Sequence, residues 1–335
     1  MSTSTAVDLA GALEHWSTRH DGADLAAVVA ALADTSAKVG AMIGGHLVRR
    51  GRTSLDRVAR DAFLAGLRAA PVRSMLSPDT PIPRRVASGG PYAVAIDPLD
   101  PTRNQDVNAP LGTIFSVLPA AAPGERMHTA YLRPGREISA AGFVLYGPAT
   151  VLGLTLGNGT QLFVLDPATG TFHRSQARTS IPSASAEVAL NASNVRHWDD
   201  AMRTFFTDLV DGSQGPYGRD FTIRWVGAVA AETYRILRSG GLFLYPADHR
   251  PGLTHGRLHL VYQAQPIALL VEQAGGIAVD GSCDILDKTP TECHERTPLI
   301  FGSRDVVHEM RHYLTTPGFT GEHSPLFRRF GLFRR

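Results

Sequence analysis

The stretch Tyr92–Asp100, which reads YAVAIDPLD, is the part of the sequence that decides the fold. It begins with a short apolar run, Tyr92–Ile96, that predicts a buried strand, and it ends in two aspartates three positions apart. Two carboxylates at a strand end, where the chain turns, can converge on one point. Hard cations such as Mg²⁺ take carboxylate oxygens readily, and the carbonyl of Leu99 can add a third oxygen.

The same residues also allow a purely structural interpretation. Asp-Pro is common in turns, so Asp97 and Asp100 could simply be solvated turn residues. For Asp97–Asp100 taken alone this interpretation is favoured, because short motifs often occur without a function. The rest of the chain has to decide between a metal site and a turn.

The composition of the 335 residues is that of a globular protein, with 43% hydrophobic and 19% charged residues. The 33 basic and 31 acidic residues give a net charge of +2, which argues against a general nucleic-acid or membrane-surface binder and leaves room for a local basic pocket. The only cysteines, Cys283 and Cys293, form no CxxC pair. They predict two reduced thiols in a cytoplasmic protein.

Hydrophobic periodicity predicts helices before the Tyr92–Asp100 stretch and a large, mostly antiparallel sheet around it. Apolar residues at helical spacing predict a long helix over Leu25–Ile43, and a second helix is expected over Leu55–Leu67 with Ser54 as its N-cap. The segment Ser77–Pro91 is rich in Pro, Gly and Ser and predicts a loop. Further strands are expected at Gly112–Leu118, Gly142–Tyr146, Val151–Leu156 and Gln161–Leu165, with a hairpin turn at Asn158-Gly159.

After Pro182 short strands alternate with helices, which predicts a second, mixed α/β part. We expect domains at 1–180 and 181–316, followed by a basic, aromatic tail at 317–335. The expected strands are Val188–Leu190, Leu242–Tyr245 and Leu258–Tyr262, and the expected helices are Asp199–Leu209, Val226–Leu237 and Pro266–Gln273.

Several segments carry a resemblance to one known family, namely Ala95–Asp100 with Asn104, Gly112–Phe115, Ala140–Gly142, Leu145–Gly147, Leu165–Pro167, Arg224–Gly227, Gly240–Ala247, Glu272–Gly276 and Gly302–Ser303. Taken together, over roughly Leu25 to Tyr313, they resemble the class I fructose-1,6-bisphosphatase family. The resemblance implies a mixed α/β fold with α-β-α-β-α layers, a homotetramer, and Mg²⁺-dependent removal of the 1-phosphate of fructose 1,6-bisphosphate.

The resemblance also implies roles for individual residues. Asp97, Leu99 and Asp100 would hold the metal, and Asp56 with Asp97 would act in catalysis. An equally weighted alternative for Asp56 is an exposed acid that favours the start of its helix. The positions that would grip the sugar phosphate are Asn191, Arg224, Tyr245 and Arg257, where arginine forks and a tyrosine hydroxyl suit a phosphate. The alternatives are strand packing for Tyr245 and a solvated surface for the arginines.

Two departures from the family pattern remove acids. The family's Glu-Glu pair corresponds here to Ser77-Pro78, and neither residue replaces a carboxylate, although Asp79 is one step away. The family's metal-bridging Glu corresponds to Gln263, which keeps an oxygen and loses the charge. A site with several dications needs negative ligands, so metal binding is expected to be weakened.

Two further departures concern phosphate. Pro101-Thr102-Arg103 stands where the family has Gly-Ser-Ser, and Pro101 removes an N–H that could bind phosphate. Arg103 could bind phosphate in another way or fill the space of a metal, so Arg103 and Gln263 are also candidates for the substrate site. Arg257 stands where Lys is usual, which keeps the charge.

Three functions follow as hypotheses. The first is a Mg²⁺-dependent fructose-1,6-bisphosphate 1-phosphatase of gluconeogenesis or the Calvin cycle. The second is a catalytically impaired member of the family that binds a sugar phosphate or a partner subunit. The third is a phosphatase for another sugar bisphosphate, such as sedoheptulose 1,7-bisphosphate, which Arg103 motivates. In each case we expect a cytoplasmic homo-oligomer without nucleic-acid or membrane partners.

Overall fold

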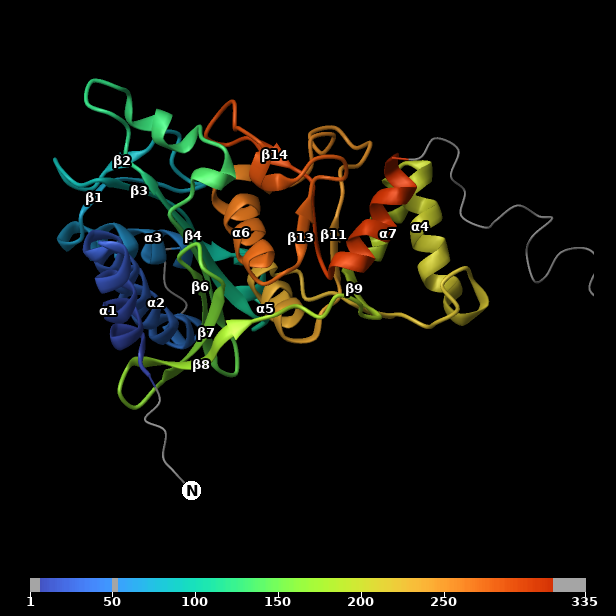
Figure 1. The fold of residues 1–335 in the computed structure, drawn as a ribbon, viewed down its shortest axis with the longest axis horizontal. Helices are drawn as coiled ribbons and strands as arrows, with labels where there is room; N and C mark the ends of the chain where they lie inside the picture. Colours follow the sequence, from blue (N-terminus) through green and yellow to red (C-terminus); the bar gives the residue numbers. More distant parts are fainter. Residues whose placement is uncertain (1–6, 50–53, 316–335) are drawn as a thin grey trace, which may run out of the picture.

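The computed structural model describes residues 7–49 and 54–315, and its elements form five layers in the order helices, sheet, helices, sheet, helices (Figure 1). This is the layered mixed α/β fold that the family resemblance implied. The tail expected at 317–335 lies outside the described residues.

The first layer consists of α1 (Leu9–His20), α2 (Ala23–Arg49) and α3 (Leu55–Gly66). By length and composition, α2 is apolar enough to cross a membrane between Ala23 and Gly45, but here it packs against α1, α3 and the large sheet. The two helices predicted in this region are confirmed. Ser54 makes no side-chain cap to α3.

The second layer is an eight-stranded sheet in the order β2-β1-β3-β4-β5-β6-β7-β8. Its pairs are antiparallel except for β1 and β3, which run parallel. The sequence analysis predicted no strand at β1, β2 or β8. The strands are β1 (Val72–Leu76), β2 (Arg84–Arg85), β3 (Tyr92–Asp100), β4 (Leu111–Pro119), β5 (Ala140–Tyr146), β6 (Thr150–Thr155), β7 (Thr160–Asp166) and β8 (Thr171–Thr179).

The two aspartates lie within β3, so the predicted turn after Ile96 is wrong. Asp97 pairs with Ile114 of β4 and Asp100 pairs with Gly112, and the register shifts between these two pairs. Pro98 lies in the shifted part and has no N–H to donate, so the ladder is interrupted there without ending the strand.

The middle layer contains α5 (Val229–Ser239) and α6 (Gln265–Gln273), which contact strands of both sheets. The strand predicted over Leu258–Tyr262 is wrong after His259. β12 is only Leu258–His259, and a π-helical turn, Leu260–Ala264, leads into α6. This run is buried on all sides, and periodicity cannot distinguish a buried strand from a buried helical segment.

The second sheet has the order β10-β9-β11-β15-β13, and α4 and α7 cover its outer face (Figure 1). Its first three strands run parallel to one another, and β15 is antiparallel to its neighbours. The elements are β9 (Glu187–Leu190), α4 (Asp200–Asp211), β10 (Thr222–Arg224), β11 (Leu242–Tyr245), β13 (Ile277–Val279), β15 (Leu299–Gly302) and α7 (Arg304–Thr315), and β14 (Arg296–Thr297) pairs with β12.

Candidate active site

Asp97 and Asp100 converge on the side-chain amide of Gln263. The amide nitrogen Nε2 donates to Asp97 Oδ2 at 2.8 Å and to Asp100 Oδ1 at 3.2 Å. All three residues are buried, with exposed fractions of 6–8%. Gln263 lies in the π-helical turn before α6, and such turns often occur at functional sites. The structure thus brings both predicted metal-binding aspartates together, with an amide between them.

The orientation of this amide follows from its other neighbour. The backbone N–H of His259 donates to Oε1 of Gln263 at 2.8 Å. A backbone N–H can only donate, so the atom facing it must be the amide oxygen and the –NH₂ group must face the aspartates.

Burial raises the pKa of both aspartates. For Asp97 the loss of solvation and the charge of Asp100 raise the pKa well above its usual value, against hydrogen bonds from Gln263 and the Leu99 N–H. For Asp100 burial is again the main cause of a raised pKa, against hydrogen bonds from the Val229 N–H and Gln263. Two like charges this close favour a proton or a donor between them.

The N-terminus of α5 supplies the remaining donor to the pair. The Val229 N–H donates to Asp100 Oδ2 at 3.1 Å, where the helix dipole favours a carboxylate. This approach depends on Gly112 of β4, because a Cβ at that position would lie 2.3 Å from the Cβ of Ala230. Glycine therefore allows α5 to reach the strand that carries the acids.

The described residues do not fit a centre of several metal ions. Asp97 and Asp100 face N–H donors from Gln263, Leu99 and Val229, and such groups do not ligate cations. Within residues 7–49 and 54–315, no group of three or more His, Cys, Asp or Glu residues could hold a metal ion. The carboxylate set that hard dications require is therefore incomplete.

Asp56 lies at the start of α3 and contacts the segment after the acid pair. Its carboxylate accepts from Thr102 Oγ1 at 2.9 Å and from Ser54 Oγ at 3.2 Å. Its charge is close enough to raise the pKa of Asp97 slightly, as the smallest of several causes. Arg103, one residue beyond Thr102, is exposed.

Asp79 does not join the acid pair. It forms an ion pair with Arg60, a largely buried residue of α3, and accepts from Ser77 Oγ at 2.7 Å. Arg60 also binds Asp61 at 2.8 Å. Asp79, one step from Ser77-Pro78, thus has the Arg60 guanidinium as the partner that neutralises its charge.

Three of the four residues predicted to grip the sugar phosphate lie along one edge of the second sheet, and the fourth, Arg257, precedes β12. Asn191 directly follows β9, Arg224 ends β10 and Tyr245 ends β11, and these strands are parallel. The carboxyl ends of parallel strands share an edge, where ligands often bind in α/β proteins. The sheet therefore brings together positions that are far apart in the sequence.

Tyr245 lies beside positive charges. Burial raises the pKa of its hydroxyl, and Arg257 and Arg250 oppose this rise. Arg257 is exposed, whereas Arg250 is held by an ion pair with Asp248 and by a 3.0 Å hydrogen bond to Asn194. The sequence analysis missed Arg250 and its two partners, and the charged residues Asp248 and Arg250 shortly after Tyr245 were the available signal.

Asn191 and Arg224 already have partners. Asn191 Oδ1 caps the following turn by accepting from the Ser193 N–H at 3.2 Å, which leaves its –NH₂ group for a ligand. Arg224 pairs with Glu187 at 3.3 Å and has a side chain that is 53% exposed. Arg224 Nε donates to this carboxylate, so a phosphate would have to bind through the terminal NH₂ groups of the guanidinium.

The segment between Trp225 and Val229 connects this edge with the acid pair. The Trp225 ring packs against the Tyr245 ring at a centroid distance of 5.6 Å, and four residues later the Val229 N–H binds Asp100. The sheet edge that carries Tyr245 and the acid pair are thus parts of one continuous region.

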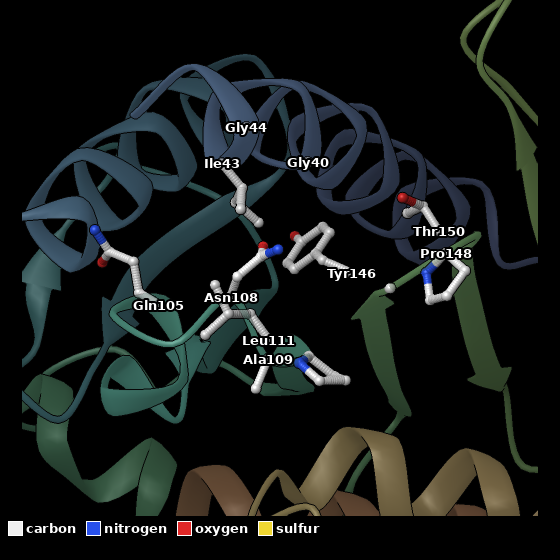
Figure 2. A pocket seen from close by; sticks show the side chains of 12 residues that line it. Gly40, Ile43, Gly44, Gln105, Asn108, Ala109, Leu111, Tyr146, Pro148 and Thr150 are labelled. Atoms are coloured by element: carbon white, nitrogen blue, oxygen red, sulfur yellow. The ribbon is translucent and has the colours of Figure 1, made fainter. Parts of the chain in front are cut away.

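A cavity of about 470 Å³ lies elsewhere, between α2 and the turns beside β4 and β5. Figure 2 shows Ile43, Asn108 and Tyr146 around it. The Tyr146 hydroxyl bonds Thr113 Oγ1 at 2.8 Å, and Thr113 donates to the Pro98 carbonyl at 2.8 Å. The cavity wall is therefore linked to the backbone of the acid motif, but the cavity itself does not include the acids.

Family models match most of the chain. The model described as "Fructose-1-6-bisphosphatase, N-terminal domain" matches residues 43–177, and the model described as "Fructose-1-6-bisphosphatase, C-terminal domain" matches residues 181–315.

Individual proteins agree with the family models. Proteins named "Fructose-1,6-bisphosphatase class 1" are 47% identical over 84% of this chain and 80% of their own length in Sinorhizobium medicae, and 42% identical over 93% of each chain in Methylorubrum extorquens. The crystal structure of fructose-1,6-bisphosphatase from Leishmania major in its holo form is similar with a TM-score of 0.85 and 27% identity. That match covers 92% of this chain and 99% of the other.

Proposed function

The chain belongs to the class 1 fructose-1,6-bisphosphatase family, and we propose that it is a phosphoric monoester hydrolase that removes the 1-phosphate of fructose 1,6-bisphosphate. The observation that carries the proposal is the continuity of the site. Paired acids, Asp97 and Asp100, are joined through the N-terminus of α5 to an edge that presents Tyr245 and arginines. This pairs a reactive centre with a phosphate-binding surface.

For substrate binding we propose Tyr245 and Arg257, with the Asn191 –NH₂ group on the same edge. Arginine forks give charge-assisted bonds to phosphate oxygens, and a tyrosine hydroxyl adds one directed bond. The roles of Arg224 and Arg103 stay predictions. Gln263 now has a different proposed role, because its polar atoms bind the acid pair and the His259 N–H.

The proposed chemistry calls for a divalent ion, which we take to be Mg²⁺, and the candidates to hold it are Asp97, Asp100 and the Leu99 carbonyl. Such an ion neutralises phosphate charge when it is bound. With the Gln263 amide between the acids, these candidates do not form an open ion site. Asp56 remains the proposed residue for activating water, because it is the acid next to the pair.

The experiment is phosphate release from fructose 1,6-bisphosphate with Mg²⁺ or Mn²⁺, over a range that includes high ion concentrations. Asp97→Asn is the control for contaminating phosphatases. Turnover of the unchanged protein well above this control supports hydrolysis. Equal rates for the two proteins at every ion concentration would rule out catalysis at this site. Sedoheptulose 1,7-bisphosphate in the same assay tests the substrate.

A second function, binding of a sugar phosphate without hydrolysis, is favoured by one observation. The amide of Gln263 occupies the side of the acid pair where an ion would be needed, while the edge around Tyr245 keeps its cations. Calorimetry with fructose 6-phosphate separates the two functions when it is combined with the activity assay. Saturable binding without turnover supports the second function, and turnover excludes it.

We expect a homotetramer in the cytoplasm, by analogy with the family, and no nucleic-acid or membrane partner. Light scattering at several protein concentrations tests the assembly. A monomer at all concentrations contradicts this part of the proposal.

A further inference from the structure

We propose that the amide of Gln263 takes the place of a divalent cation between Asp97 and Asp100, so that residue 263 controls whether this site binds a metal ion. The inference rests on the proposed function only because that function makes this site the active site. It concerns ion binding, which can be measured without any substrate.

The geometry of the amide is the first support. Two buried carboxylates that face each other need a cation, a proton or donors between them. The Gln263 –NH₂ group has two hydrogens, and Nε2 lies within hydrogen-bond distance of one oxygen of each aspartate, at 2.8 and 3.2 Å. It therefore binds both carboxylates at once, as a small cation would.

The fixed orientation of the amide is the second support. A rotated amide would direct its oxygen at the aspartates, where it could ligate an ion, but its –NH₂ group would then meet the His259 N–H. Two donors facing each other in a buried place leave a hydrogen bond unmade, which is costly. The His259 N–H thus keeps donors, and not a ligand oxygen, on the side of the acids.

The consequence can be tested by replacing the amide –NH₂ group of residue 263 with an oxygen. Gln263→Glu keeps the shape of the side chain, and one carboxylate oxygen can still accept from the His259 N–H. The other oxygen then faces Asp97 and Asp100, so three carboxylates meet where only two met before. Such a set repels itself without a cation and suits a hard dication.

The experiment is titration of the full-length protein with Mn²⁺ alone, followed by the loss of the free-ion electron paramagnetic resonance signal. In the unchanged protein we expect no Mn²⁺ site with a Kd below about 1 mM. In Gln263→Glu we expect a Mn²⁺ site that is at least about tenfold tighter than this limit. Thermal unfolding gives a second readout. Mn²⁺ should raise the Tm of Gln263→Glu and leave that of the unchanged protein where it is.

Two control variants isolate the effect. Gln273→Glu adds the same charge at the end of α6, where Gln273 Oε1 accepts from the Gly159 N–H at 2.7 Å, and it should gain no Mn²⁺ site. The double variant Asp97→Asn with Gln263→Glu should lose the new site. Both controls distinguish a built site from a general gain of negative charge.

The outcomes decide the proposal. Micromolar Mn²⁺ binding by the unchanged protein that Asp97→Asn removes would overturn it, as would a folded Gln263→Glu variant with no gain in affinity. If Gln263→Glu does not fold even with Mn²⁺, the titration of the unchanged protein and of Asp97→Asn still decides. Phosphate release is measured separately, so a protein without turnover counts against the proposed function and leaves this inference standing.

Discussion

At the edge of the second sheet, the hydroxyl of Tyr245 can be removed without loss of the ring contacts that pack this residue. Its ring packs against Trp225 and Phe243, with centroid distances of 5.6 and 6.1 Å, and these contacts do not involve the hydroxyl. The hydroxyl lies beside Arg257 and Arg250. It is therefore suited to bind a phosphate without being needed for packing.

Tyr245→Phe should weaken binding of fructose 6-phosphate by about fivefold, because one directed hydrogen bond contributes about 1 kcal/mol. The Tm should change little, since the ring contacts remain. Calorimetry measures the affinity, and Tyr234→Phe in α5 is the matched control. Unchanged affinity in Tyr245→Phe would mean that this edge does not hold the phosphate.

Asp248 holds Arg250 in place behind this surface. The ion pair and hydrogen bonds from Arg250 lower the pKa of Asp248, although burial acts in the opposite direction. The ionised form of Asp248 is therefore more stable in the folded protein than in the unfolded chain. Its contribution to stability is present above the pKa of the unfolded chain and is lost as pH falls through the lower, folded pKa.

Asp248→Asn should make the free energy of unfolding less dependent on pH at and below about pH 4, where an unfolded aspartate titrates. Near pH 7 the variant should be less stable than the unchanged protein, and the difference should shrink as the pH falls. Urea unfolding at several pH values measures this. A difference that is constant with pH would contradict the role given to the Arg250 pair.

At the scale of elements, the contact between α5 and β4 decides where the acids find their donors. The helix begins at Val229, and its second residue, Ala230, lies over Gly112 of β4. A side chain at position 112 would also meet the Val144 carbonyl oxygen at 2.9 Å. The absence of a side chain at Gly112 is thus a condition for the bond between the Val229 N–H and Asp100.

Gly112→Ala should destabilise the protein by about 1–3 kcal/mol, which is typical of an overpacked core. It should also reduce catalysis or ligand binding more than its effect on stability explains, because α5 must shift away from Asp100. Gly44→Ala in α2, where a Cβ would meet nothing within 4 Å, is the control. A Gly112→Ala protein as stable as the control would show that α5 has room to move.

The elements also show where local sequence patterns were sufficient. The long helix was predicted because its apolar residues recur at helical spacing, and β3, β4 and β5 were predicted as short apolar runs because they are buried along most of their length. β8, β13 and β15 were missed, and the buried run after His259 was assigned to a strand although it forms a π-helical turn. In that run every side chain is buried, so the pattern has no polar face from which to read a period.

At the scale of the whole molecule, the middle helices connect the two sheets. α5 and α6 contact strands of both sheets, and one cluster of buried residues extends through the layer. The parts predicted as domains 1–180 and 181–316 therefore share a core in the described structure. Neither sheet can expose its inner face without losing contacts to these helices.

This shared layer predicts a single cooperative unfolding transition. Trp16 packs in the first helical layer and Trp198 packs under α4, so each reports on one side of the molecule. One variant carries Trp198→Phe and Trp225→Phe and keeps only Trp16. The other carries Trp16→Phe and Trp225→Phe and keeps only Trp198. The fluorescence of both variants should give the same urea midpoint. Two separate midpoints would mean that the sheets unfold independently.

The sequence by itself determined which acids and cations are present and which helices and strands carry most of them, because these follow from residue type and local period. Only the tertiary structure decided their partners. Gln263 donates a hydrogen bond to Asp97, 166 positions away in the sequence, and Val229 donates one to Asp100, 129 positions away. Arg60 forms an ion pair with Asp79. Such contacts depend on how α5, α6 and the sheets pack, and no local pattern encodes that packing. The physical reason is that a carboxylate becomes a metal ligand or a hydrogen-bond acceptor according to the group that faces it.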